Sequence, residues 1–138
     1  MGTYSQYCET KVLELTVGKT AFSTPTTYLA LVTTVPTSTT TAGSSLAEAT
    51  YTGYARLATA SGWGTATAAS PSTIFNSAAL TFAACSSGSN VITGFALCDA
   101  STVAAGNVLM WASCASTTIS TTQTPPTFAA NAIEVTLS

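Results

Sequence analysis

Charge is the scarcest feature of this sequence, which contains three basic residues, five acidic residues and no histidine in 138 positions. Charged residues make up 6% of the chain, whereas an average soluble domain has about 25%. Three basic residues cannot form the lysine and arginine cluster that binds a phosphate backbone, so no nucleic-acid partner is expected. The lack of histidine removes the commonest general base, and with it serine–histidine and cysteine–histidine catalytic sites. We therefore expect no enzymatic activity.

Motifs for cofactors and metals are missing as well. The sequence has neither of the common glycine-rich phosphate-binding motifs, and its few acids are too scattered to suggest the carboxylate pair of a glycosidase. The cysteines Cys8, Cys85, Cys98 and Cys114 form no CxxC pair, so we expect no cofactor and no metal. We predict free thiols packed as small apolar side chains, with two disulfides as the alternative.

The sequence also lacks long apolar runs. None reaches the ~18 residues that cross a bilayer, and the N-terminus has no basic region followed by an apolar one, so we expect neither a membrane partner nor a signal peptide. Serine, threonine and alanine replace the missing charged residues. Such a surface can pack against other chains without burying charges and repels neighbouring copies weakly. It favours a subunit of an assembly, the alternative being a secreted protein of low charge density.

One short amphipathic helix is predicted at residues 4–17, YSQYCETKVLELTV. Its apolar residues recur at spacings of four, four and three, as they do on one face of a helix. These residues are Tyr4, Cys8, Val12 and Leu15. Thr3 and Gln6 have the spacing of a capping box, and Gly18 suits a helix end.

Strand-like segments fill the rest of the chain. They are 27–35, 50–60, 74–82, 91–100, 107–114 and the alternating NAIEVTLS at the end. Turn-forming residues separate them, segment 91–114 predicts a hairpin with a long loop, and NSAALTF within 74–82 predicts a core strand. Roughly six to eight strands with one helix indicate an all-β fold, an antiparallel sandwich or jelly roll over 27–138 with the helix at one end or edge. Residues 1–138 are expected to form a single domain.

Arg56 is the only arginine and lies within the predicted strand 50–60. Its planar guanidinium suits a bidentate pair with a carboxylate, which could belong to a partner or to this chain. We predict an internal, structural ion pair with Glu48, and Asp99 is the alternative acid.

Five aromatic residues are candidates for a partner interface: Tyr4, Tyr7, Tyr51, Tyr54 and Trp63. Trp63 lies between two glycines, with Tyr51 and Tyr54 nearby in the sequence, so these rings could stack on a sugar or anchor a protein contact. The alternative for Trp63 is a core position that covers the sandwich. Tyr4 and Tyr7 belong to the predicted helix, which either packs on its own sheet or docks on a neighbour.

Several stretches of the chain, taken in order, resemble a known family. The first is YCETKVLELTVGKTAFSTPTTYLALVT, and the most specific is AGSSLAEATYTGYARLA, which contains Glu48, Tyr54 and Arg56. They are followed by NSAALTF, VITGFALCDASTVAAGNVLMWAS and PPTFAANAIEVTL. In their order and spacing they resemble small virion structural proteins of tailed phages, often labelled tail-fibre-like. The resemblance implies a virion structural role without enzymatic activity.

Two functions fit these expectations. The first is a capsid decoration or cement protein, expected as a homotrimer, which binds the major capsid protein on the outer capsid surface and stabilises the assembled shell by mass action. A single domain without shaft repeats or heptads suits a cap better than a fibre. The alternative is a tail-fibre or baseplate module that recognises host glycans through Tyr51, Tyr54 and Trp63, and a cell-surface adhesin is a weaker third. The expected location is the virion, with the host cytoplasm during assembly.

Overall fold

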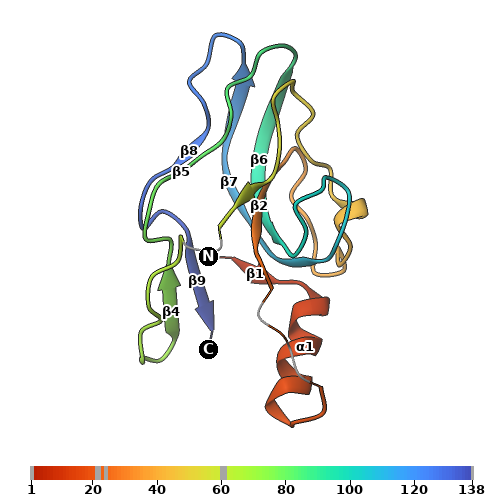
Figure 1. Cartoon of the computed structure of the whole chain (residues 1–138), viewed down its shortest axis with the longest axis vertical. Helices are drawn as coiled ribbons and strands as arrows, with labels where there is room; N and C mark the ends of the chain where they lie inside the picture. The colour runs from red at the N-terminus through yellow and green to blue at the C-terminus, as the bar shows by residue number, and fades with distance from the viewer. Residues whose placement is uncertain (1, 21–22, 24, 60–61, 138) are drawn as a thin grey trace.

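A computed structural model describes residues 2–20, 23, 25–59 and 62–137, and within them the fold is mostly β with one α-helix (Figure 1). The main sheet has the strand order β1-β7-β6-β2-β3, and all of its pairings are antiparallel. Its strands are β1 (Thr3–Tyr4), β2 (Tyr28–Val32), β3 (Leu57–Ala58), β6 (Ser89–Cys98) and β7 (Val108–Ser120). The predicted all-β antiparallel fold with one short helix is confirmed.

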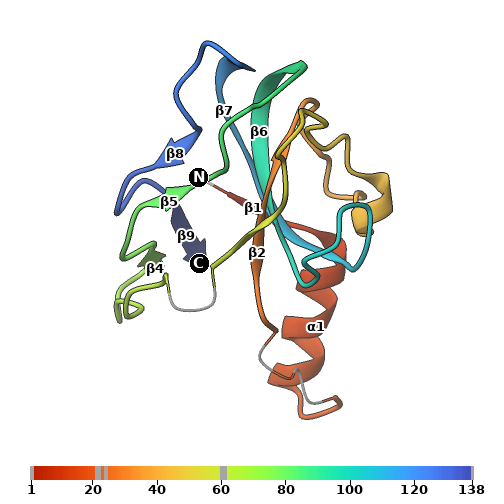
Figure 2. The ribbon, with the colours of Figure 1, turned by 45° about the horizontal axis from the view of Figure 1, so that its top comes forward.

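Two antiparallel ribbons lie beside this sheet (Figures 1 and 2). One pairs β4 (Ser72–Phe75) with β9 (Glu134–Leu137), and the other pairs β5 (Leu80–Thr81) with β8 (Thr127–Phe128). A single 3₁₀ turn, η1 (Gly43–Ser45), lies in the long connection between β2 and β3. Helix α1 (Gln6–Thr16) projects from one end of the molecule, next to the β4–β9 ribbon.

The centre of the fold is the hairpin of β6 and β7, which confirms the hairpin predicted from segment 91–114. The pairing runs from Ser89 with Ser120 to Cys98 with Val108, and a bulge interrupts it between Ile92 and Gly94. Ten residues of β6 alternate between buried and more exposed positions, as the period of two in a strand requires. Residues 99–107 form the long loop at the closed end.

The main sheet is buried on both faces, because alternate residues of β2 and β6 enter two different clusters. The larger cluster lies between the sheet and the ribbons and contains Leu29, Leu31, Tyr51, Leu80, Phe82, Ile92, Ile119 and Ile133. The smaller one lies on the opposite face and contains Ala30, Val32, Ala96, Cys98 and Val108, with Leu46 and Trp111 packed against it. This two-sided burial explains why β2 reads as a continuous apolar run.

The start of the helix differs from the prediction. Thr3 and Tyr4 form strand β1, paired with Trp111 and Met110, and the helix begins only at Gln6. Its cap is Ser5, whose hydroxyl accepts a hydrogen bond from the amide of Cys8 and donates one to the carbonyl of Val108. The capping box at Thr3 is therefore wrong, because pairing with β7 holds Tyr4, which would be the first helical residue, in extended backbone. The predicted end is correct, with Gly18 at a φ of 69°.

Two predicted strands are shorter than expected. In segment 50–60 only Leu57–Ala58 form a strand, β3, while Ala60 lies outside the described residues. Segment 74–82 is divided between β4 and β5, because the backbone bends at Asn76. The side-chain amide of Asn76 is fully buried. Its Nδ2 donates to the carbonyls of Ala78 and Ala129, and its Oδ1 accepts a hydrogen bond from the backbone amide of Ile133. NSAALTF therefore delivers Leu80 and Phe82 to the core without forming one continuous strand.

Candidate interaction surface

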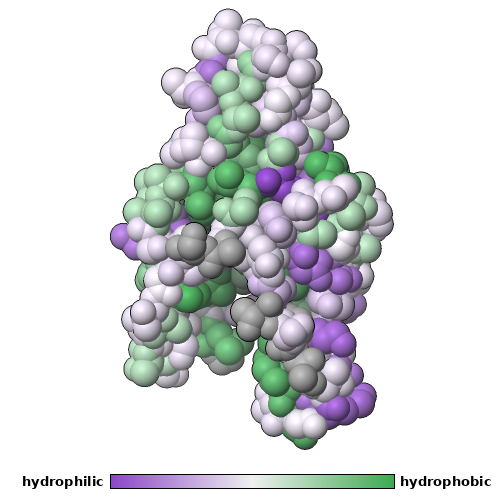
Figure 3. Space-filling view, viewed as in Figure 1, coloured by the Kyte–Doolittle hydropathy of each residue, from purple (hydrophilic) through white to green (hydrophobic). Residues whose placement is uncertain are grey.

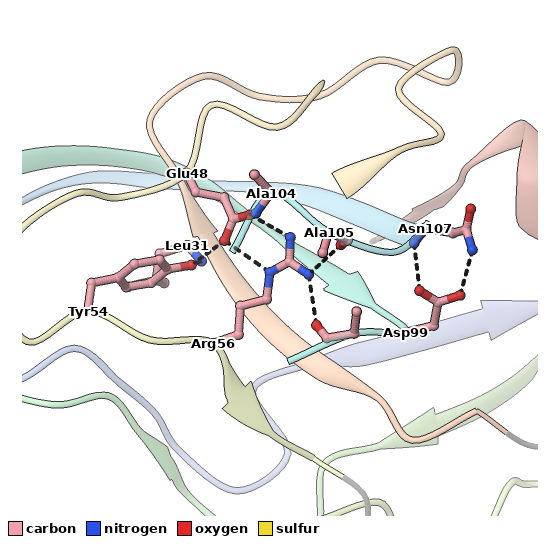
Figure 4. A network of polar contacts seen from close by, with 9 residues as sticks. Leu31, Glu48, Tyr54, Arg56, Asp99, Ala104, Ala105 and Asn107 are labelled. Atoms are coloured by element: carbon pink, nitrogen blue, oxygen red, sulfur yellow. Dashed lines mark hydrogen bonds and ion pairs between the residues drawn. The ribbon is translucent and has the colours of Figure 1, made fainter. Parts of the chain in front are cut away.

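A buried polar network joins three segments that are distant in the sequence (Figure 4). The guanidinium of Arg56 donates from Nε to Glu48 Oε2 at 3.1 Å and from Nη2 to Glu48 Oε1 at 2.5 Å. Its Nη1 donates to the carbonyls of Ala100 and Ala105 at 2.8 and 2.9 Å. The side chains of Arg56 and Glu48 are 0% and 4% exposed. This ion pair is buried, bidentate and tied to the β6–β7 loop, which is the geometry of a structural role.

The carboxylate of Glu48 has further partners. It accepts hydrogen bonds from the hydroxyl of Tyr54 at 2.9 Å and from the amide of Ala104 at 3.2 Å. The Tyr54 hydroxyl in turn accepts one from the amide of Leu31 in β2 at 3.1 Å. Every polar group of this buried cluster therefore has a partner, and the loop, the sheet and the chain around Glu48 are held together.

The alternative acid, Asp99, does not pair with Arg56 but forms hydrogen bonds within the same loop. It accepts hydrogen bonds from the backbone and side-chain amides of Asn107, at 2.6 and 2.8 Å, and so closes the loop on itself. Gly43 and Gly106 permit the close approach: a Cβ on Gly43 would lie 2.1 Å from the Ala105 carbonyl oxygen, and one on Gly106 would lie 2.4 Å from the Asp99 carboxylate. These glycines are steric requirements of the network.

Burial and this network shift the pKa values of three side chains. Burial by itself lowers the pKa of Arg56, but the hydrogen bonds to Glu48 and the neighbouring negative charge more than compensate, and the pKa is raised. The pKa of Tyr54 is raised, first by burial and then by the charge of Glu48, so its hydroxyl remains a donor. Burial raises the pKa of the Cys98 thiol to about 11. These three groups therefore keep one protonation state at neutral pH.

Tyr51 and Tyr54 do not offer a stacking platform. Tyr51 is 3% exposed, its hydroxyl donates to the Ala83 carbonyl, and its ring packs edge-on against Tyr54. The Tyr54 ring stacks on Phe82 at 6.2 Å between centroids. The expectation that these two rings face a glycan is corrected, because both pack in or against the apolar cluster on the ribbon side of the sheet.

Trp63 lies half-buried beside Asn76, against the same cluster. It lines a small cavity together with Leu29, Phe95, Trp111 and Glu134. The space in this cavity is about 10 Å³, which is room for about one water molecule. The ring of Trp63 is therefore a packing residue with one exposed edge, and the cavity beside it does not admit a sugar.

Tyr4 and Tyr7 lie half-buried at the start of the chain, on β1 and α1. Tyr4 lines a groove between α1 and β9, and the other residues that line it are Glu9, Val12, Leu13 and Leu137. We call it the α1–β9 groove. Its volume is about 300 Å³, and apolar side chains face each other across the hollow between the two projecting lobes in Figure 3.

The largest exposed apolar side chains gather at this end of the molecule. Leu13 is 67% exposed, Val17 75% and Leu137 53%, and Leu15 is exposed on the helix as well. Sequence reasoning missed the groove, because the predicted apolar face ran through Tyr4, Cys8, Val12 and Leu15. A signal was present, since Leu13 and Val17 are four residues apart and share a face. Nothing in the sequence, however, indicated that Leu137 lies opposite them.

A second open surface follows the outer edge of β7. Strand β1 pairs with β7 only at Met110 and Trp111, so the edge beyond them has no neighbouring strand among the described residues. Unpaired edges invite association with other strands. Here the bulge opposite Thr93 interrupts the edge, and such bulges are one way in which sheet proteins block edge pairing. The α1–β9 groove is therefore the more favourable surface for a partner.

The described residues hold no cluster of three or more potential metal ligands. All four cysteines are free thiols, with Cys8, Cys85 and Cys98 buried and Cys114 partly buried. Within the same part of the chain, no helix has the length and apolar character needed to span a membrane.

Comparison with protein families gives a match that covers residues 3–136. The matching family is described as podophage GP4 fiber I protein gp80. The chain belongs to this family. No curated protein matches the chain.

Membership of this fibre protein family makes the chain a phage virion structural protein and agrees with the resemblance found in the sequence. The match includes the helix, the main sheet and both ribbons up to residue 136, so all but Leu137 of the residues that line the α1–β9 groove lie within it.

Proposed function

We propose that this chain is a non-enzymatic structural subunit of a podophage fibre. The observation that carries the proposal is the match to a fibre protein over nearly the whole chain. The geometry supports it, because a charge-poor sheet with an exposed apolar groove is suited to permanent packing against other proteins. The rigid part is fixed by the buried Glu48–Arg56 pair, and the groove supplies the contact surface.

Host recognition through a sugar is the less favoured part of this proposal. Of the three rings expected to stack on a glycan, Tyr51 is buried in the core and Tyr54 is partly buried against it. The third, Trp63, borders a cavity with room for about one water molecule. We therefore assign the chain an architectural role within the fibre.

A capsid decoration protein is the second candidate. The specific observation in its favour is that the sequence contains no shaft repeats and no heptads, which suits a cap on a surface better than an extended fibre. In that role the chain would bind the major capsid protein on the outer face of the shell, as a homotrimer, and would stabilise the assembled state by mass action.

Labelling of intact virions tests both candidates. Gold-labelled antibodies against the purified chain are imaged on virions by electron microscopy, and the purified chain is co-sedimented with empty capsids and with unassembled coat protein. The fibre proposal predicts label at the tail and no saturable binding to shells. Label over the head with saturable binding to shells overturns it in favour of decoration. If mass spectrometry finds no trace of the chain in purified virions, both are wrong.

A further inference from the structure

The chain turns after β7 and returns as β8, but these two consecutive strands do not pair with each other (Figures 1 and 2). Strand β7 pairs with β6 and, near its start, with β1, while β8 pairs with β5. Two hollows of about 250 and 430 Å³ lie between β7 and β8. They adjoin, because both are lined by Thr117, Ile119, Pro126 and Thr127. We call the two hollows together the β7–β8 slot.

Backbone groups are available on both sides of this slot. In antiparallel pairs every second residue directs its amide and carbonyl away from the partner strand. Among the described residues, 112–119 make no backbone–backbone hydrogen bond except with β6. On the other side the Phe82 amide donates to the Pro126 carbonyl, so the backbone groups of the next residue, Thr127, point away from β5. An extended peptide is the ligand that satisfies such edges.

A bulge forms a pocket at one end of the slot. Residues 114–116 of β7 lie opposite Thr93 alone. Bulges bend a strand and redirect its side chains, and here Cys114 and Ala115 line the hollow of about 250 Å³. The bulge prevents another sheet from continuing this edge, so the α1–β9 groove remains the better surface for a folded partner. Residues 117–120 pair regularly with β6 again, which leaves a short edge for a single extended segment.

The lining of the slot restricts the chemistry of its occupant. The inner wall of the pocket is apolar and consists of Leu31, Ile92, Ile119 and Phe128. The larger hollow is lined mainly by threonines and prolines. No charged residue lines either hollow, and residues 100–133 contain none. A charged side chain would lose its water here without gaining a partner. The occupant is therefore uncharged and has an aliphatic side chain for the pocket.

We propose that the β7–β8 slot binds an extended, uncharged segment of another protein, which adds one strand beside residues 117–120 of β7. Alternate side chains of the segment face inward, and one aliphatic side chain fills the pocket against Leu31, Ile92 and Phe128. Main-chain hydrogen bonds supply the affinity and the pocket selects the side chain, as in other complexes formed by strand addition. The inference rests on the surface of the chain alone and holds for a location on the tail or on the head.

The first test measures binding of a defined peptide to the full chain. The probe is a fluorescently labelled peptide with blocked ends and the sequence Thr-Ser-Leu-Thr-Leu-Ser-Thr, and saturable binding by fluorescence anisotropy is expected. One control peptide has lysine in place of both leucines, and another carries N-methyl groups on its backbone amides. Each should bind at least about tenfold more weakly, because the first brings charge to the pocket and the second lacks backbone donors.

The second test fills the pocket from the protein side. Ala115 is exposed and lines the pocket, so Ala115→Trp should leave the fold intact and weaken binding of the leucine peptide at least about tenfold. The matched control, Ala68→Trp, places the same ring at another exposed alanine, in the turn before β4, and should leave the affinity unchanged. Far-UV circular dichroism verifies that both variants retain their secondary structure.

The third test uses a thiol that is already present in the pocket. Cys114 is only partly buried and lines the pocket, whereas Cys8, Cys85 and Cys98 are buried. Saturating leucine peptide should slow the alkylation of Cys114 by iodoacetamide in the native chain, because the inserted side chain covers the thiol. Mass spectrometry of proteolytic fragments assigns the label to this cysteine. The lysine-containing peptide at the same concentration should leave the rate unchanged.

Four results would overturn the inference. They are no binding of the leucine peptide up to about 1 mM, equal affinities of the leucine peptide and its N-methylated form, equal affinities of the Ala115→Trp and Ala68→Trp variants, and an alkylation rate of Cys114 that bound peptide does not change.

Sedimentation equilibrium of the same variants examines the other possible occupant, a segment of an identical chain. Self-association that Ala115→Trp abolishes and Ala68→Trp preserves would assign the slot to this chain itself and would also contradict the proposal. None of these results bears on where antibodies label the virion, so failure of this inference is distinguishable from failure of the proposed function.

Discussion

Helix α1 and the Glu48–Arg56 network between them account for seven of the eight charged residues, and they use these charges in opposite ways. The network includes Glu48, Arg56 and Asp99, each fixed by hydrogen bonds in the interior or at the base of a loop. The helix and the turn after it carry the other four, Glu9, Lys11, Glu14 and Lys19, on the surface. Both regions contain ion pairs, but burial gives them different consequences.

On the helix, Glu14 is bound by Lys11 at 3.3 Å and by Lys19 at 3.1 Å. These hydrogen bonds, with that to Lys19 the strongest influence, lower the pKa of Glu14. Solvent-exposed pairs of this kind contribute little to stability and can exchange partners. The buried pair cannot exchange partners, because an uncompensated charge in the interior is costly. Charge is therefore buried and fixed in the network, whereas on the helix it lies at the surface.

The largest expected effect comes from breaking the buried pair. Glu48→Ala leaves the Arg56 guanidinium, the Tyr54 hydroxyl and the Ala104 amide without their acceptor, and should lower the free energy of unfolding by about 3–5 kcal/mol. Urea denaturation measures the change. The matched control is Glu9→Ala at the exposed end, where we expect a change within about 0.5 kcal/mol. Similar losses for both variants would show that burial does not separate the two regions.

A pair of glycine substitutions sharpens the comparison, because Gly18 and Gly106 share a φ of 69°. Alanine at either position bears the left-handed strain of about 1 kcal/mol. At Gly106 the new Cβ would also lie 2.4 Å from the Asp99 carboxylate and 2.5 Å from the Ala100 Cβ, whereas at Gly18 nothing lies within 4 Å. Gly106→Ala should therefore be the more destabilising by about 1–3 kcal/mol. Equal melting temperatures of the two variants would contradict the close packing of the loop.

The third prediction concerns pH. Burial raises the pKa of Cys98 from its ordinary 9.0 to about 11, so the folded chain retains the thiol proton at a pH where the unfolded chain has lost it. The stabilising contribution is complete below the unfolded value and is lost as the pH rises through about 11. It amounts to about 3 kcal/mol.

Cys98→Ala removes this titration, and its free energy of unfolding should fall less steeply than that of the wild type between these two pH values. Urea unfolding at several pH values gives the two slopes. The smaller side chain also loses packing contacts, which lowers the free energy of unfolding by the same amount at every pH. This constant loss is measured at neutral pH and is separable from the change in slope. Parallel curves would mean that the thiol is not buried as described.

The smallest effect on stability is expected at the exposed end. Leu13→Ala removes a side chain that is 67% exposed and should change the free energy of unfolding of the dilute monomer by less than about 0.5 kcal/mol. The matched change in the sheet, Leu31→Ala, removes a leucine that is 1% exposed and should cost about 2–5 kcal/mol. A large loss for Leu13→Ala in the monomer would show that the helix packs on its own chain.

Local patterns predicted the elements with the strongest periodicity. Alternation identified β9, β-branched and apolar segments identified β2, β6 and β7, and the glycine after the helix marked its end correctly. Errors occurred where a distant segment decides the local structure. Ser5 caps the helix because β7 holds Thr3 and Tyr4 in extended backbone. Segment 74–82 bends because the side chain of Asn76 bonds to residues more than 50 positions later.

The sequence by itself determined the class of the fold and the scarcity of charge, because strand alternation and composition are local properties. It also favoured Glu48 over Asp99 as the acid that pairs with Arg56. Only the tertiary structure shows how the pair is held, with the β6–β7 loop placing two carbonyls beside the same guanidinium. Only the tertiary structure placed Leu13 opposite Leu137 to form a groove. Such a groove forms when residues from the two ends of a chain lie side by side, and a local sequence pattern does not predict which distant residues do so.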